Sequence, residues 1–222
     1  MENVFLLNDR IEAVMKKCLS PLCTITLFSI AMAFLETAVV IYLRELLYPA
    51  GFSFPLAPMP AHLVLTEILR EAATIIMLIG AGMLAGKTFS QKFAWFIYAF
   101  ATWDIFYYIF LKILIHWPAS FCTWDILFLI PSTWTGPVLS PIIVSLTMIA
   151  LALVILYFAG EGYKTTISFM EWLMLFAGSV ILIVAFTWDY SRFILEHYSF
   201  KDLWTLPDKQ MLYNTALSYI PG

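Results

Sequence analysis

The sequence predicts an all-α, polytopic integral membrane protein with five transmembrane helices and a short re-entrant or interfacial segment between the third and the fourth. Only 12% of the 222 residues are charged and 62% are hydrophobic, whereas soluble domains carry about 25% charged residues. The mean hydropathy is +0.88. Five apolar runs are each long enough for the hydrocarbon core, which needs about 20 residues. We therefore expect one transmembrane domain over 1–222. The net charge of −3 argues against nucleic acid as a partner.

The elements follow one another along the chain with clear boundaries. Residues 1–17 mix charges of both signs with scattered apolar residues, which predicts an amphipathic segment on the membrane surface and not a cleaved signal peptide. The prolines lie at or outside the ends of the apolar runs, where residues that interrupt helices belong. The predicted spans are 22–43, 63–86, 93–115, 138–159 and 167–188, and an outer tail follows at 198–222.

The stretch 121–141, between the third and fourth spans, is expected to form a lid. Its apolar run is too short to cross a membrane, and three prolines and a glycine interrupt it. We expect a short helix over 125–130, with Asp125 as its N-cap, followed by irregular backbone. Such backbone at membrane depth needs protein or water beside it.

The basic residues of the short loops indicate the orientation. Lysines in the loops after the second and fourth spans lie on the same side as the basic residues before the first span. The loops at 46–61 and 117–137 contain no Lys or Arg. By the positive-inside rule, the N-terminus is cytoplasmic and the C-terminus is outside.

The third span carries an unusual polar pattern. Asp104 and Lys112 are eight residues apart, and Tyr107 and Tyr108 lie between them, so the four side chains follow one stripe of a helix. A charged side chain in hydrocarbon costs about 2.5–3.5 kcal/mol on insertion scales. The stripe is therefore expected to face protein or water.

On this topology most charges fall in the outer half of the membrane, where acids outnumber bases. The eight acids are Glu36, Glu45, Glu67, Glu71, Asp104, Asp125, Asp189 and Glu196, and the four bases are Arg44, Arg70, Lys112 and Arg192. Four surplus carboxylates in a low dielectric call for protons, a cation or a cationic partner.

Two interpretations remain open for the acids of the first two spans. Glu67, Arg70 and Glu71 stand at i, i+3 and i+4, so they form either a self-neutralising patch or a site in which the glutamates hold Arg70 for a ligand. Glu36 has no basic residue within one turn. Its partner must come from another helix, from water or from a proton, and both a structural and a functional role are consistent with this.

The tripeptide Thr-Trp-Asp occurs three times and ends at Asp104, Asp125 and Asp189. One interpretation is that its tryptophans anchor the outer interface. The alternative is that the three aspartates converge on one pocket beneath the lid. Gly82 and Gly86 form a GxxxG motif in the second span, which predicts close helix packing, within the chain or with a partner.

No metal or cofactor is assigned. His62, His116 and His197 all fall on the outer side, but their spacing matches no HxxxH or ExxH pair. The sequence also lacks Walker, GxSxG, HExxH and CxxC motifs, so no catalytic residue is named.

Three functional hypotheses follow. The first is an outward-facing site that binds a polar or cationic ligand, a proton, or the head of a lipid-soluble molecule such as a quinone. The second is a non-catalytic subunit of a larger respiratory or transport complex, whose charged stripe docks partner helices. The third is an intramembrane enzyme that acts on lipid headgroups. The candidate ligand- or proton-binding residues are Glu36, Glu67, Arg70, Glu71, Asp104, Tyr107, Tyr108, Lys112, Asp125, Asp189 and Arg192.

Overall fold

The computed structural model describes residues 2–48, 60–130 and 132–197, and this part of the chain contains five helices and one hairpin. Each helix includes a stretch long and apolar enough to span a membrane. The protein is therefore an integral membrane protein, and the five predicted spans are confirmed in number. The helices are α1 (Glu2–Leu47), α2 (Ala61–Ala85), α3 (Phe89–Ile115), α4 (Leu139–Gly160) and α5 (Phe169–His197).

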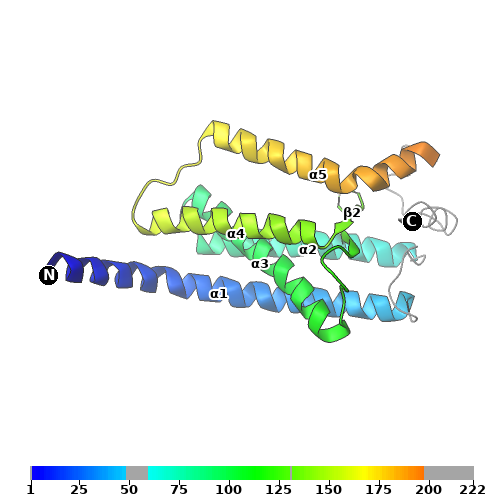
Figure 1. Cartoon of the computed structure of the whole chain (residues 1–222), viewed down its shortest axis with the longest axis horizontal. Helices are drawn as coiled ribbons and strands as arrows, with labels where there is room; N and C mark the ends of the chain where they lie inside the picture. Colours follow the sequence, from blue (N-terminus) through cyan, green and yellow to red (C-terminus); the bar gives the residue numbers. More distant parts are fainter. Residues whose placement is uncertain (1, 49–59, 131, 198–222) are drawn as a thin grey trace.

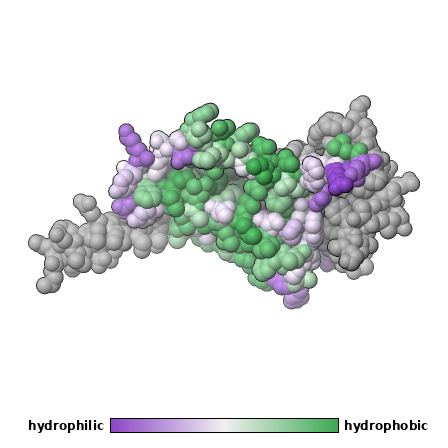
Figure 2. Space-filling model, turned by 45° about the horizontal axis from the view of Figure 1, so that its top comes forward, coloured by the Kyte–Doolittle hydropathy of each residue, from purple (hydrophilic) through white to green (hydrophobic). Residues whose placement is uncertain are grey.

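Helix α3 lies at the centre of the bundle and packs against α1, α2 and α4 (Figure 1). Its small and aromatic residues fill the core, in which Ala94 and Ala99 are fully buried and Trp95 and Trp103 pack around them. Helix α5 follows a long loop and lies to one side of this bundle (Figure 1). On the face seen in Figure 2, apolar side chains cover the middle of the molecule and polar ones gather towards its ends, as expected of a protein within a bilayer.

The glycines of α2 allow the α2–α3 pair to pack closely at one end of the bundle. A Cβ atom on Gly82 would lie 2.7 Å from the carbonyl oxygen of Lys92 and 2.8 Å from the backbone nitrogen of Phe96. Gly86 packs in the same way against the backbone of Lys92. The GxxxG motif therefore packs within the chain, one of the two outcomes that the sequence allowed.

The segment between α3 and α4 forms a β-hairpin, so the short helix predicted over 125–130 is wrong. Strand β1 (Trp124–Phe128) pairs antiparallel with β2 (Trp134–Pro137), and Asp125 lies opposite Gly136. Asp125 is therefore not a helix N-cap. A six-residue segment is too short to offset the cost of nucleating a helix, and pairing with β2 satisfies its backbone groups. The re-entrant or interfacial placement of this segment stays a prediction.

Helix α1 differs from the prediction at its start. It begins at Glu2 and continues through Pro21, which was expected to mark the edge of the first span. A proline inside a helix removes one backbone hydrogen bond but does not always end the helix. The placement of 1–17 on the membrane surface stays a prediction, and the predicted tail at 198–222 lies outside the described residues.

Candidate functional site

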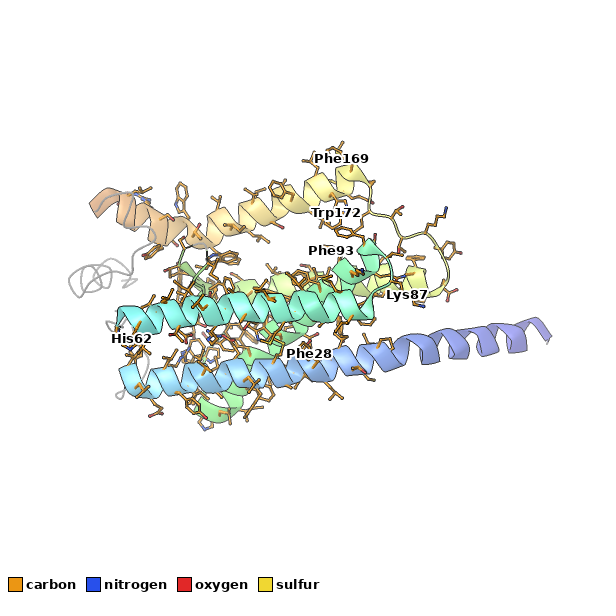
Figure 3. The ribbon with its side chains drawn as sticks, turned by 180° about the vertical axis from the view of Figure 1, so that it is seen from behind. Phe28, His62, Lys87, Phe93, Phe169 and Trp172 are labelled. Atoms are coloured by element: carbon orange, nitrogen blue, oxygen red, sulfur yellow. The ribbon has the colours of Figure 1, made fainter. Side chains whose placement is uncertain are left out.

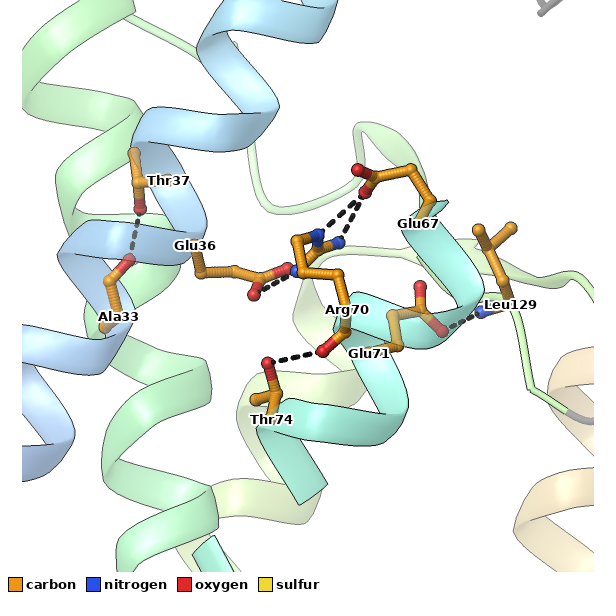
Figure 4. Close-up of polar contacts among 8 residues, drawn as sticks. All are labelled: Ala33, Glu36, Thr37, Glu67, Arg70, Glu71, Thr74 and Leu129. Atoms are coloured by element: carbon orange, nitrogen blue, oxygen red, sulfur yellow. Dashed lines mark hydrogen bonds and ion pairs between the residues drawn. The ribbon is translucent and has the colours of Figure 1, made fainter. Parts of the chain in front are cut away.

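Polar side chains converge where α1, α2, α3 and the hairpin meet, at the end of the bundle that we call the hairpin end. One group is centred on Arg70 of α2, which pairs with Glu36 of α1 and Glu67 of its own helix (Figure 4). The Arg70 Nε donates to Glu67 Oε2 at 2.8 Å, and Nη2 lies 2.7 Å from the same oxygen. The partner of Glu36 thus comes from a neighbouring helix. We call these three residues the Arg70 group.

Glu71 points away from Arg70 and contacts the hairpin instead. Its Oε2 accepts a hydrogen bond from the backbone N–H of Leu129 at 2.9 Å (Figure 4). Only 7% of Glu71 is exposed. The two glutamates that flank Arg70 in sequence therefore have different roles: Glu67 binds the guanidinium, and Glu71 fastens the hairpin to α2.

A second group is centred on Asp125 of β1, which is 2% exposed. Arg44 Nη2 of α1 lies 3.5 Å from Asp125 Oδ1, and the hydroxyl of Tyr108 donates to Oδ2 at 3.4 Å. The Arg44 guanidinium also lies 3.9 Å above the Trp117 ring, a cation–π geometry. Burial raises the pKa of Asp125 to about 7, because Arg44, the backbone N–H of Ile126 and the Tyr108 hydroxyl only partly offset the loss of water. We call Arg44, Tyr108 and Asp125 the Asp125 group.

Asp104 and Tyr107 of α3 complete the polar cluster, by which we mean the Arg70 group, the Asp125 group, Glu71, Asp104 and Tyr107. Ser145 of α4 donates to Asp104 Oδ2 at 2.8 Å. The Tyr107 side chain interacts electrostatically with charges of both groups, and its backbone oxygen accepts a bond from Thr37 of α1 at 3.4 Å. Tyr107 therefore lies between the two groups.

Three of the candidate residues lie elsewhere. Lys112 is exposed and donates to the backbone oxygen of Pro118 at 2.9 Å, beyond the end of α3. Asp189 is exposed on α5. Arg192 pairs at 2.7 Å with Glu196 of the same helix, and its side chain is 65% exposed. The structure thus separates Asp189 from Asp104 and Asp125, and it directs Lys112 away from the cluster.

Some participants were not among the candidates. Arg44 was counted only as an outer base, and Ser145 lies in a span that the sequence predicts to be free of charge. A hydroxyl residue within an apolar span is the signal that points to Ser145 and Thr37. No sequence pattern points to the N–H of Leu129, because every residue except proline carries one.

The described cluster contains five acids and two arginines. The acids are Glu36, Glu67, Glu71, Asp104 and Asp125, and the bases are Arg44 and Arg70. If all were ionised, three negative charges would remain. Among the described residues, no group of three or more His, Cys, Asp or Glu side chains is arranged to hold a metal ion.

Comparisons with known proteins do not extend this description. No protein-family model matches the chain, and neither a curated protein nor a solved structure matches it.

Proposed function

We propose that this membrane protein binds a proton or a small cation at the polar cluster. The observation that carries the proposal is the excess of three carboxylates over arginines in a largely buried cluster. Burying unpaired charge is costly, so the excess is neutralised by protons or by a cationic ligand.

The contacts indicate which residues meet the ligand. Arg70 is already bound by two carboxylates, so it serves to position them and does not favour an anionic ligand. Glu71 and Asp104 have one neutral hydrogen-bond donor each, Leu129 N–H and Ser145 Oγ. These two acids are the groups with the most uncompensated charge. We therefore propose that these two acids bind the positive charge of the ligand.

We also propose an orientation of the protein in the membrane. The hairpin end carries the exits of α1 and α3 and the start of α2, with His62 at that start and Lys87 at the opposite end of α2 (Figure 3). The distribution of Lys and Arg favours a cytoplasmic N-terminus and an outward hairpin end. The site then takes its ligand from outside, beneath an interfacial hairpin.

The test is the thermal unfolding of the full chain in detergent with Na⁺, K⁺, Ca²⁺ or tetramethylammonium, combined with infrared spectra of the carboxyl groups at several pH values. We expect either one cation to raise the melting temperature, or a protonated-carboxyl band that titrates. A ligand at 100 times its Kd stabilises by about 2.7 kcal/mol.

The variants Glu71→Gln and Asp104→Asn should each reduce the cation effect or remove part of the infrared band. Asp189→Asn is the matched control, because this acid is exposed on α5, and it should behave like the parent. A parent that shows neither a cation effect nor a titrating band would contradict the proposal.

One observation favours the alternative, a subunit of a larger membrane complex. Within its most apolar stretch, α5 has no buried residue. Native mass spectrometry of the parent separates the two readings. Co-purifying polypeptides that Glu71→Gln or Asp104→Asn releases would make the cluster a docking surface, whereas a chain free of partners supports the binding site.

A further inference from the structure

The β1–β2 hairpin is held on the bundle by two carboxylates that lie on opposite sides of the contact. Asp125 belongs to the hairpin and meets Arg44 of α1 and Tyr108 of α3. Glu71 belongs to α2 and accepts the N–H of Leu129 in the hairpin. The hairpin is thereby fastened to three helices of the bundle.

The contacts of Asp125 are long for a buried acid. Charge-assisted hydrogen bonds are usually about 2.7–2.9 Å, whereas the contacts of Asp125 with Arg44 and Tyr108 are 3.5 Å and 3.4 Å. Together with the backbone N–H of Ile126, these two contacts compensate only in part for the removal of the carboxylate from water. The other titratable groups that face Asp125 are Asp104, whose charge disfavours its ionisation, and Tyr107.

The consequence for the hairpin has a definite sign. In water, as in an open hairpin, an aspartate has its ordinary pKa of 3.8, and in the closed hairpin the pKa of Asp125 is raised to about 7. The closed state thus binds the proton more tightly than the open state. By linkage, closure becomes less favourable as the pH rises from about 4 to about 7, and above about 7 the dependence levels off.

We propose that the β1–β2 hairpin is a proton-controlled latch, which closes over the polar cluster while Asp125 carries a proton and loosens when Asp125 ionises. A protonated carboxyl can keep both observed contacts, because its oxygens can still accept from Arg44 and from the Tyr108 hydroxyl. The strands can move together, since the backbone of Val138 bonds to Thr123 at 3.0 Å where both enter the hairpin.

The movement of the hairpin does not depend on a ligand. The idea that this movement controls access to the polar cluster does rest on the proposed function. Proton uptake would close the site, and proton release would open it. The test below uses no ligand, so the latch and the binding site can fail separately.

The experiment is amide hydrogen exchange of the full chain in detergent, followed by mass spectrometry of peptides that cover β1 and β2. The parent is compared with Asp125→Asn at the same pH, so that the chemical effect of pH on exchange cancels. The asparagine mimics the protonated acid and cannot ionise. At each pH we divide the exchange rate of the hairpin in the parent by the rate in Asp125→Asn. We expect this ratio to rise at least about tenfold between pH 5 and pH 8.

Three further variants make the result specific. Glu71→Gln keeps an oxygen that accepts from Leu129, so it should keep a parental pH dependence. Asp104→Asn removes a charge that disfavours ionisation of Asp125, so its pH dependence should persist but shift to lower pH. Tyr108→Phe removes a donor to ionised Asp125, and its hairpin should exchange faster than the parent at pH 8 and less so at pH 5. This variant tests the latch even if Asp125→Asn does not fold.

Two results would overturn the latch. One is a constant ratio between parent and Asp125→Asn from pH 5 to pH 8. The other is a pH dependence that survives in Asp125→Asn and disappears in Glu71→Gln, which would assign the titration to α2.

Discussion

Helices α3 and α5 carry the same tripeptide, Thr-Trp-Asp, in opposite surroundings. In α3, 44% of the most apolar stretch is buried inside the protein, and in α5 none of it is. Asp104 of α3 is bonded to Ser145 of α4, whereas Asp189 of α5 is exposed. A polar motif on such a helix therefore acquires its role from the helices packed around it.

The attachments of α5 explain its position. Trp172, near its start, contacts the rings of Phe93 and Phe89 of α3 at centroid distances of 4.8 Å and 5.5 Å (Figure 3). Further along, Phe186 stacks on Trp134 of the hairpin at 5.8 Å. Aromatic contacts of this kind contribute about 0.5–1.5 kcal/mol each beyond their buried area. Helix α5 is therefore held at separate points, and its Asp189 is exposed.

We expect the largest change in stability when an arginine of the bundle is replaced, and an arginine of α5 serves as the comparison. Arg70→Gln leaves Glu36 and Glu67 without their cation, and we expect a loss of stability of about 3–5 kcal/mol. Arg192→Gln removes exposed interactions with Glu196 and Asp189 and should leave the melting temperature unchanged. Thermal unfolding in detergent measures both. Equal effects would mean that α5 is packed as firmly as α2.

A smaller effect is expected from adding one methyl group to each of two glycines. In Gly82→Ala the new Cβ would meet the backbone of Lys92 at 2.7 Å, so we expect destabilisation by about 1–3 kcal/mol. Gly178 of α5 has no atom within 4 Å of such a Cβ, so Gly178→Ala should stabilise the helix by up to about 1 kcal/mol. Thermal unfolding of the two variants gives the comparison, and a loss of stability in Gly178→Ala would reveal a close neighbour of α5.

We expect the smallest change in stability when the aspartate of the tripeptide in α3 is replaced, and the aspartate of the tripeptide in α5 serves as the comparison. Asp104→Ala leaves the Ser145 hydroxyl without its acceptor and should cost about 1–2 kcal/mol. Asp189→Ala should leave the unfolding temperature as it is, because the side chain is exposed. The double variant Asp104→Ala with Ser145→Ala provides the check: it should be less destabilised than the sum of the single variants.

Part of the site was predictable from spacing within single helices. The i, i+3 spacing of Glu67 and Arg70 predicts their contact, and it forms. Glu36, alone on its helix, was expected to find a partner elsewhere, and it meets Arg70. The choice between Glu67 and Glu71 was not predictable, because it depends on the position of the hairpin.

The main error of the prediction from sequence was the short helix over 125–130, where the structure has a hairpin. Residues 126–130 form a short apolar run, a pattern that fits a helix turn or a strand equally well. The strand pairing depends on β2, whose Gly136 and Pro137 looked like interruptions of structure rather than a partner for β1. A contact between segments that are separated along the chain leaves little trace in either segment alone.

The sequence alone predicts five helices that are long and apolar enough to span a membrane, because the low dielectric of a bilayer demands long apolar runs whose backbone groups are satisfied within each helix. Which charged side chains meet depends on how the helices and the hairpin pack together. Asp104, Asp125 and Asp189 are alike in sequence, but packing places the first two among bonded partners and leaves the third exposed. Local forces fix the helices, whereas the polar cluster depends on which faces they turn towards one another.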